Sequence, residues 1–407
     1  MDGRAVTGLP KLLLLGGDGG RSGVPRYLEQ LARALAGRAK ITVVSEEDHG
    51  GFGFVREMGL GHRVVEGLAS SLQPRRLVRA TGALGRVIAD EAPDVIWANA
   101  RVTLPMARWC LRQSTNPPKL ICTYHGIPFG PGHGTAMSAL QWQVERLSLT
   151  WGPPEWQVFL TDEDREGMGK LAGGRHAARI ISNGSDLGGF LPQQTASGPG
   201  IRLVMLTRDA AQKNLDAAAR LMAALPEQVT LALYGTGTQA EGLQRRFAKV
   251  LPPGGLRRIH FGGPTVGVRS AQAAADGFLM TSRYEGQSLA MLEAMEFGLP
   301  VFSTQVGGAT GMALVHPLME ILALEDAREV KDSAARLLAC CRAWKQDSAA
   351  ASQRIHEAWA RNYSIDFFDH QVRGLWQDVT APAEKPAPVR PVLHEVQALR
   401  VGRQNKG

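Results

Sequence analysis

The sequence predicts an α/β protein built from two doubly wound, parallel-sheet domains. Short apolar runs alternate with segments of helical periodicity through the first half of the chain, and the same alternation restarts after residue 200. Such alternation is typical of a parallel sheet whose strands are joined by crossover helices. A chain of 407 residues is also long enough for two domains with separate hydrophobic cores.

The predicted elements fall into two sets. The strands of the first set are Lys11–Leu15, Ile41–Val44, Val95–Trp97, Leu120–Tyr124, Val158–Leu160 and Ile180–Ile181, and those of the second are Leu203–Leu206, Thr230–Tyr234, Arg258–Phe261, Gly277–Met280 and Val301–Ser303. A polar stretch with Gly and Pro, Gln193–Gly200, separates them. We therefore expect an N-terminal domain over 1–195 and a C-terminal domain over 196–360. The Pro-rich, basic stretch 380–407 cannot build a core, and we expect it to be disordered.

The charge of the chain limits its partners. The formal net charge is +8, but aromatic residues make up only 6% of the sequence, and neither a zinc-finger spacing nor an RNP-like segment occurs. Basic residues without stacking partners argue against nucleic acid. Phosphorylated small molecules and an anionic membrane surface stay open as partners.

The sequence also suggests a location. No apolar segment approaches the roughly 18 residues needed to span a bilayer, and the four cysteines show no metal-ligand spacing, so we expect a cytoplasmic protein. One stretch, Arg56–Arg86, combines six arginines with Leu68, Leu72, Leu77, Val78 and Leu84. It could rest on anionic lipid at the inner face of the plasma membrane, or form an ordinary solvated helix face.

The most informative segment runs from Ser282 to Pro300 and carries two carboxylates, Glu285 and Glu293, eight positions apart. It follows a predicted strand, Ser288 is placed to cap a helix, and a Gly-Leu-Pro sequence ends that helix. Glu293 therefore lies on a helix that is apolar almost all round, where a carboxylate is costly unless it is hydrogen-bonded. Glu285 lies in the loop at the carboxyl end of a strand, where open α/β sheets bind ligands.

Two cations flank another predicted helix start. Arg208 and Lys213 follow the strand Leu203–Leu206, and Asn214 is a candidate cap for the helix over Leu215–Leu225. Backbone N–H groups at a helix N-terminus together with two cations form a site for a diphosphate. The alternative interpretation is a pair of solvated surface cations.

Glycine-rich loops follow two further strands. Gly235 and Gly237 fit a GxGxxA pattern, but the acidic residue that an NAD site needs about 20 positions later is missing. We interpret them as a tight turn near nucleotide phosphates. In the first half, Gly19 and Gly20 belong to a glycine loop that misses GxGxxG by one residue, and we expect that loop to face the cleft between the domains.

His125 follows the predicted strand Leu120–Tyr124 and precedes a glycine, so it would lie opposite the Glu285 loop if the two domains close. It is either a reacting-centre residue or a structural histidine. The Asp162-Glu163-Asp164 sequence looks like a metal motif, but it follows Thr161 as the acidic first turn of a helix does, and we expect no metal there.

These segments together resemble the retaining glycosyltransferases of family 4, which have the GT-B fold and use nucleotide-diphosphate sugars. The resemblance covers residues 11 to 379. It rests on the E-x7-E element from Glu285 to Glu293, the Arg208–Lys213 pair, and three further segments: the glycine loop continuing through Gly23-Val-Pro-Arg-Tyr-Leu, Tyr124-His125-Gly126, and Asn183-Gly184-Ser-Asp186.

The resemblance implies a role for each matched residue. Glu293 would accept hydrogen bonds from the nucleotide ribose and Glu285 would lie by the donor sugar. Arg208 and Lys213 would stabilise the leaving diphosphate in place of a metal, and His125 would contact the sugar. Gly19 and Gly20 would let the first-domain loop approach both substrates. Gly235, Gly237, Gly286, Gln287 and Ser288 complete the expected binding residues, and a final helix over 361–379 would cross back to the first domain.

The expected activity is transfer of a sugar from a nucleotide sugar, with no metal or other cofactor, to a glycan or lipid-linked cell-envelope acceptor in polysaccharide biosynthesis. Two alternatives stay open: a sugar-nucleotide epimerase of similar fold, and a non-catalytic glycan-binding or interaction module. The second draws on Thr310-Gly311, which stand where the family often has a glutamate.

Overall fold

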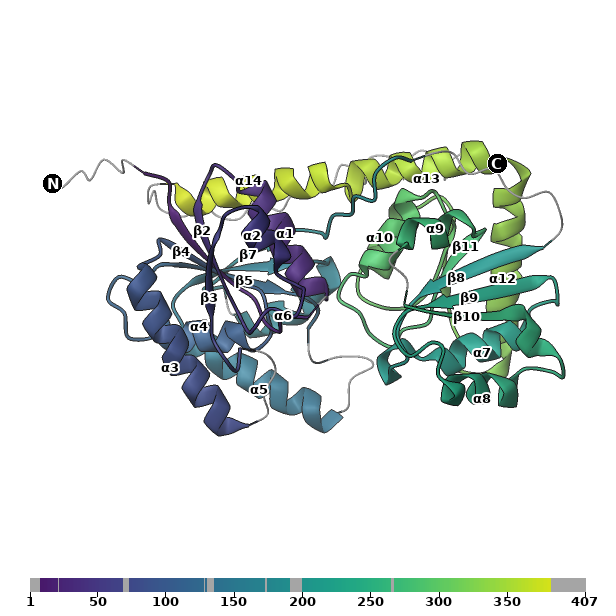
Figure 1. The fold of residues 1–407 in the computed structure, drawn as a ribbon, viewed down its shortest axis with the longest axis horizontal. Helices are drawn as coiled ribbons and strands as arrows, with labels where there is room; N and C mark the ends of the chain where they lie inside the picture. The colour runs from purple at the N-terminus through teal and green to yellow at the C-terminus, as the bar shows by residue number, and fades with distance from the viewer. Residues whose placement is uncertain are drawn as a thin grey trace.

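The structure is a computed structural model that describes residues 8–381, except 21, 69–72, 128, 130–134, 173, 191–199 and 265–266. Figure 1 shows two α/β bodies side by side, with two long C-terminal helices running along one side of both. Of the predicted tail, 380–407, Thr380 is the last residue of a helix, and residues 382–407 lie outside the described residues.

The first body contains a seven-stranded sheet in which every neighbouring pair is parallel, in the order β3-β2-β1-β4-β5-β6-β7. The strands are β1 (Lys11–Leu15), β2 (Lys40–Ser45), β3 (Gly61–Val64), β4 (Val95–Ala98), β5 (Lys119–Tyr124), β6 (Glu155–Phe159) and β7 (Ala177–Ile180). The helices are α1 (Gly23–Ala34), α2 (Gly53–Glu57), α3 (Pro74–Glu91), α4 (Thr103–Leu111), α5 (Thr135–Trp151) and α6 (Asp162–Ala172).

The second body contains a six-stranded parallel sheet in the order β10-β9-β8-β11-β12-β13. Its strands are β8 (Ile201–Leu206), β9 (Val229–Tyr234), β10 (Ile259–Gly263), β11 (Gly277–Met280), β12 (Val301–Thr304) and β13 (Met319–Leu322). Its helical elements are η1 (Ala211–Lys213), α7 (Leu215–Ala224), α8 (Glu241–Val250), η2 (Gly255–Arg258), α9 (Val268–Ala273), α10 (Leu289–Glu296), α11 (Ala309–Val315) and α12 (Ala327–Gln346).

The fold class predicted from the sequence is confirmed: two doubly wound parallel sheets are present. Two strands escaped the sequence prediction, β3 and β13. Both are edge strands of four residues, and most of their side chains are half-buried or exposed. Such strands do not need a continuous apolar run, and neither has one. Edge strands of this kind give no period that sequence reasoning can detect.

In both sheets the strand order reverses beside the first strand of the domain, between β1 and β4 and between β8 and β11. Ligands of open α/β sheets bind outside the carboxyl ends of the strands at such switch points. The loops that follow β8 and β11 carry Arg208, Lys213 and Glu285. The topology therefore brings these three residues to one place.

The last two helices connect the bodies. Helix α13 (Ser348–Asn362) packs on α10 of the second body, and α14 (Ile365–Thr380) packs on α1 of the first. The buried side chains of α14 belong to the first body's core: Phe368, Val372, Leu375, Trp376 and Val379. The chain thus returns to the first domain after completing the second.

The core position of α14 predicts the effect of one truncation. Trp376→Ala should lower the unfolding free energy of the first domain by about 3–5 kcal/mol, because it removes a large side chain from a close-packed core. The measurement is urea unfolding monitored separately for each domain. Gln377→Ala, on the exposed side of the same helix, is the matched control and should change little. Equal small effects from both variants would contradict the placement of α14 in this core.

Candidate active site between the two domains

The carboxyl edges of the two sheets meet at a pair of glycines. Gly126 follows β5 with φ +94°, and a Cβ there would lie 3.0 Å from the Cα of Gly286. A Cβ on Gly286 would lie 2.6 Å from the carbonyl oxygen of His125. Any larger residue would push these backbones apart. The structure therefore places His125 directly beside the loop that carries Glu285.

Lys213 and Glu285 form an ion pair at the second domain's switch point, with Lys213 Nζ 2.5 Å from Glu285 Oε1. Further hydrogen bonds join the two loops that carry them. The Thr281 hydroxyl donates to the Lys213 carbonyl at 3.0 Å, and the Gln212 amide donates to the Tyr284 carbonyl at 2.9 Å. The cation and the carboxylate are thus held by their loops in one arrangement.

Arg208 lies on the same loop as Lys213 and is exposed, with one weak contact to Gln212 at 3.3 Å. The glycine turn packs against this loop: Gly235 has φ +136°, and a Cβ there would lie 1.5 Å from the Thr207 carbonyl oxygen. Gly237, with φ +82°, approaches Asp209. The predicted turn and the predicted cation pair are therefore neighbours, and the guanidinium of Arg208 is accessible to a ligand.

Glu293 lies on α10 with its side chain only 5% exposed, and its partner comes from the other domain. Arg26 of α1 donates from Nη1 to Glu293 Oε1 at 2.5 Å. Burial raises the pKa of Glu293, and the Arg26 charge opposes that rise. Sequence reasoning included Arg26 in the family resemblance but assigned it no role. A single arginine on an amphipathic helix is ordinary, so the sequence did not indicate a partner 267 residues away.

A second buried carboxylate of α10, Glu296, binds the segment that connects the domains. It accepts hydrogen bonds from the Ser185 hydroxyl at 2.8 Å and from the backbone N–H groups of Leu187 and Gly188 at 2.5 and 3.1 Å. Ser185 in turn accepts from the Trp359 indole at 2.8 Å. Glu296 is therefore a structural carboxylate.

Gln287 and Ser288, which the sequence places in the donor site, are both largely buried. The Gln287 side-chain oxygen accepts from the Asn183 backbone N–H at 2.6 Å, and the Asn183 side chain donates to the Gln287 carbonyl at 2.9 Å. Ser288 occupies the N-cap position of α10, but its hydroxyl makes no capping hydrogen bond. Asn214 likewise stands at the N-cap of α7 without a side-chain cap. Gln287 in this arrangement links the two domains.

Four buried polar atoms near these strand ends have no hydrogen-bond partner within the described part of the chain: Asn99 Oδ1 after β4, His125 Nε2 after β5, Asp164 Oδ2 after β6 and Ser282 Oγ after β11. Buried polar groups are nearly always paired, so each such atom requires an explanation. Burial lowers the pKa of His125 to about 4 and raises that of Asp164 to about 6. His125 is therefore neutral at pH 7. The four atoms are suited to hydrogen-bond a polar ligand.

A buried ionic network supports the strand that carries His125. Arg108 of α4 donates to both oxygens of Glu155 at 2.8 Å, to Glu145 of α5 at 2.7 Å and to the Tyr124 hydroxyl at 2.6 Å. Removing one partner of such a buried network leaves an uncompensated charge. Tyr124 directly precedes His125, so the network fixes the position of the histidine.

The glycine loop at Gly19 and Gly20 and the start of α6 make contacts within the first domain. Gly19 packs inside the first domain, where a Cβ would lie 1.7 Å from the Glu47 carbonyl oxygen, and the Gly20 N–H donates to Asp18 at 3.0 Å. At the start of α6 the Thr161 hydroxyl accepts from the Asp164 N–H at 3.1 Å, which is the capping contact that the sequence predicts. Over the described ranges, no group of three His, Cys, Asp or Glu residues is placed to hold a metal ion.

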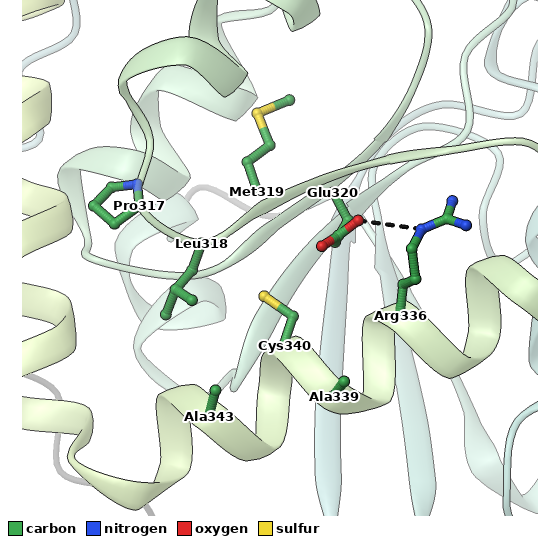
Figure 2. A pocket seen from close by; sticks show the side chains of 8 residues that line it. All are labelled: Pro317, Leu318, Met319, Glu320, Arg336, Ala339, Cys340 and Ala343. Atoms are coloured by element: carbon green, nitrogen blue, oxygen red, sulfur yellow. Dashed lines mark hydrogen bonds and ion pairs between the residues drawn. The ribbon is translucent and has the colours of Figure 1, made fainter. Parts of the chain in front are cut away.

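A separate hollow of about 290 Å³ lies between β13 and α12 (Figure 2). Its polar contact is the Arg336–Glu320 ion pair at 3.2 Å, and its other lining side chains are mostly apolar. The lining residues Pro317, Leu318 and Met319 stand at the amino end of β13, the opposite edge of the sheet from the switch point. This hollow is therefore separate from the candidate site.

Comparison with known proteins agrees with this arrangement. A family model described as "Glycosyl transferase 4-like domain" matches residues 22–184, and one described as "Glycosyl transferases group 1" matches residues 201–340. The sulfoquinovosyl transferase SQD2 of Arabidopsis thaliana is 26% identical over 253 residues, 55% of this chain and 45% of that protein. The chain thus spans less than half the length of this curated relative.

Solved structures share the fold. HepE of Anabaena, solved in complex with UDP and glucose, superposes with a TM-score of 0.71 at 17% identity, over 90% of this chain and 99% of that one. Sucrose-phosphate synthase of Thermosynechococcus elongatus gives a TM-score of 0.71 at 18% identity, over 91% and 99% of the two chains.

Two facing parallel-sheet domains with a site at their switch points define a protein of GT-B fold. Each half of the chain also matches a glycosyltransferase model. The chain belongs to the GT-B glycosyltransferases of the family-4-like group.

The cross-domain ion pair predicts a pH-dependent stability loss. Arg26→Gln should cost about 2 kcal/mol at pH 8 and less at pH 5. Without Arg26, the pKa of Glu293 in the folded state rises further above its unfolded value. Stability is then lost as the pH increases from the unfolded pKa to this higher folded pKa. The measurement is urea unfolding at both pH values.

Arg33→Gln is the matched control, because Arg33 lies on the same helix but pairs with Glu29 at the surface. It should cost no more than about 1 kcal/mol at either pH. A cost for Arg26→Gln that does not change with pH would contradict an ionic link to Glu293.

Proposed function

We propose that the chain transfers a sugar from a nucleotide-diphosphate sugar to a glycan or a lipid-linked cell-envelope acceptor, with retention of configuration. The observation that carries the proposal is the grouping of Arg208, Lys213 and Glu285 at the second domain's switch point, directly beside His125 of the first. A protein of similar structure supports a nucleotide sugar as the donor: HepE was solved with UDP and with UDP-glucose.

In the proposed reaction the bond between the anomeric carbon and the diphosphate breaks while the acceptor oxygen attacks the same face of the sugar, and the proton of the acceptor hydroxyl passes to the leaving phosphate oxygen. Negative charge develops on the leaving phosphate. Arg208, Lys213 and the backbone N–H groups at the start of α7 are positioned to stabilise that charge, and they do so more strongly in the transition state than in the ground state. We propose that these cations replace a metal ion at the leaving group.

The two carboxylates of the E-x7-E element serve to hold the donor. Glu285 shares an ion pair with Lys213, so an arriving diphosphate would take over Lys213 and leave Glu285 to the sugar hydroxyls. Glu293 would accept the ribose hydroxyls while Arg26 keeps its carboxylate charged. Because His125 is neutral at pH 7, its unpaired Nε2 can donate to or accept from a sugar hydroxyl, depending on its tautomer.

We further propose that the acceptor belongs to cell-envelope polysaccharide biosynthesis and that the protein works at the cytoplasmic face of the membrane. The described residues contain no helix with the length and hydrophobicity required to cross a bilayer. A lipid-linked acceptor would then have to be reached from the membrane surface.

The cation pair gives a direct test. A thermal-shift panel of nucleotide sugars first identifies the donor, and release of nucleoside diphosphate from that donor gives the turnover. Arg208→Ala and Lys213→Ala should each lower kcat about 10²–10³-fold, as removal of one preorganised transition-state donor does.

Arg257→Ala and Lys249→Ala remove exposed cations elsewhere on the second domain and are the matched controls. They should leave the rate unchanged. Wild-type rates in Arg208→Ala and Lys213→Ala would overturn the proposal. Conversion of the donor to an isomer without release of nucleotide would instead establish an epimerase.

A further inference from the structure

The outer surface of the first domain carries an unusual concentration of exposed apolar side chains. Of the twelve large apolar side chains exposed among the described residues, seven lie on the three adjacent helices α3, α4 and α5. They are Leu77, Val78, Trp109, Leu140, Val144, Leu147 and Trp151. Helix α4 packs between α3 and α5, so the seven belong to one side of the sheet (Figure 1).

Four of these side chains form a stripe along α5. Residues 140, 144, 147 and 151 recur every three or four positions, which places them on one helix face. The core-facing side of α5 is instead formed by buried Glu145, Ser148 and Leu149. The stripe therefore faces solvent, although apolar residues at this spacing on a surface helix normally face the core.

The stripe continues onto α4 through two tryptophans. Trp151 contacts Trp109 edge to face with their ring centroids 5.8 Å apart, and the Arg112 guanidinium lies 3.7 Å above the Trp109 ring. Tryptophan and arginine with apolar neighbours are typical of surfaces that lie at a membrane interface.

The charges around the stripe are mostly basic. On α4 and on the described part of α5, the one acidic residue is Glu145, which is buried against Arg108. Arg112 at the end of α4 and Arg146 on α5 are exposed, and Arg75, Arg76 and Arg79 are exposed at the start of α3. Arg76 lies 3.7 Å from the carboxylate of Glu66, and Asp90 is exposed at the other end of α3. The acidic first turn of α6 marks the border of this basic region.

We propose that this outer face of α3, α4 and α5, the apolar–basic face, docks on an anionic lipid bilayer. The apolar stripe would enter the headgroup region, and the arginines would contact acidic headgroups. A second copy of the chain fits less well, because pairing this face with itself would bring like charges together. The inference rests on the proposed function in one respect, since it supplies the route to a lipid-linked acceptor.

The face differs from the surface that the sequence suggested. Of the stretch Arg56–Arg86, Leu68 and Leu84 are fully buried in the core, and Arg63 pairs with Glu91 at 2.7 Å. Arg56 lies on α2, whose buried residues pack on the opposite side of the sheet from α3. On α3 the side chains of Arg75, Arg76, Arg79 and Arg86 stay exposed, and Leu72 lies outside the described residues. The larger apolar contribution comes from α5.

The face also adjoins the candidate site. Helices α3, α4 and α5 follow the carboxyl ends of β3, β4 and β5, so their first turns lie at the same edge of the sheet as His125. A bilayer contacting Leu77, Val78 and Leu140 would therefore lie near the cleft opening. This geometry suits an acceptor whose sugar is presented from the membrane.

Vesicle co-sedimentation of the full chain tests the proposal. Vesicles of phosphatidylcholine alone are compared with vesicles in which roughly a third of the lipid is phosphatidylglycerol. We expect binding to the anionic vesicles only. The double variant Leu140→Glu/Val144→Glu should lose it. The triple variant Arg75→Gln/Arg76→Gln/Arg79→Gln should weaken partitioning about 100-fold, since each basic residue near an anionic surface contributes roughly 5-fold.

Two controls carry the same changes elsewhere. Val250→Glu/Leu314→Glu replaces two apolar side chains that are 39% and 63% exposed on the second domain, and Arg245→Gln/Arg257→Gln/Arg328→Gln removes three exposed arginines there. Both should bind as the unchanged chain does, and thermal melts show that all variants are folded.

Three results would overturn the proposal: no preference for anionic vesicles, equal loss in the control variants, or a dimer in sedimentation velocity that Leu140→Glu/Val144→Glu dissociates. The thermal shift produced by a nucleotide sugar, measured without vesicles, reports the donor site separately. A chain that binds the donor but no vesicle refutes the docking face alone, and one that binds vesicles but no donor refutes the proposed function alone.

Discussion

The arrangement of the two domains depends on two buried carboxylates of one apolar helix, α10. Glu293 binds Arg26 of the first domain, and Glu296 binds the connecting segment at Ser185, Leu187 and Gly188. Burying a carboxylate is costly unless ion pairs or hydrogen bonds compensate it, so each carboxylate requires its partner to be present. Helix α10 therefore fixes where the first domain stands relative to the switch point of the second. This placement brings the backbones of Gly126 and Gly286 into contact.

In the resulting site, most of the charged side chains are paired with one another. Lys213 holds Glu285 and Arg26 holds Glu293, while Arg208 is accessible. A diphosphate that binds Lys213 would replace Glu285 as its partner, and a ribose that binds Glu293 would add to the contact with Arg26. Neither charge would have to be buried without a partner. In contrast, buried polar atoms of Asn99, His125 and Ser282 have no hydrogen-bond partner among the residues that the structure describes. Pre-paired charges together with unpaired hydrogen-bonding atoms suit a ligand that is both anionic and rich in hydroxyl groups.

Much of the fold was predictable because its central strands are continuous apolar runs, as Leu12–Leu15 shows. The edge strands β3 and β13 lack that signal, and their existence depends on a neighbour. At the site, the sequence indicated Lys213 and Glu285 because both follow strands. It could not indicate that Arg26 reaches Glu293 or that Gln287 is engaged by Asn183, since these contacts join residues more than 100 positions apart. The exposed stripe of α5 was missed for a different reason: its spacing predicts burial, and only the structure shows that it faces solvent.

The central proposal is that the two neighbouring carboxylates of α10 differ in role: Glu293 pairs with Arg26 and also binds the nucleotide, whereas Glu296 binds only the chain itself. Isothermal titration calorimetry with the nucleoside diphosphate of the identified donor tests this most directly, with Glu293→Gln compared with Glu296→Gln. We expect Glu293→Gln to weaken binding about 10–100-fold, because two ribose hydrogen bonds to a charged acceptor are lost. Glu296→Gln should keep the wild-type affinity and lower the melting temperature instead. Unchanged affinity in a folded Glu293→Gln variant would contradict the account.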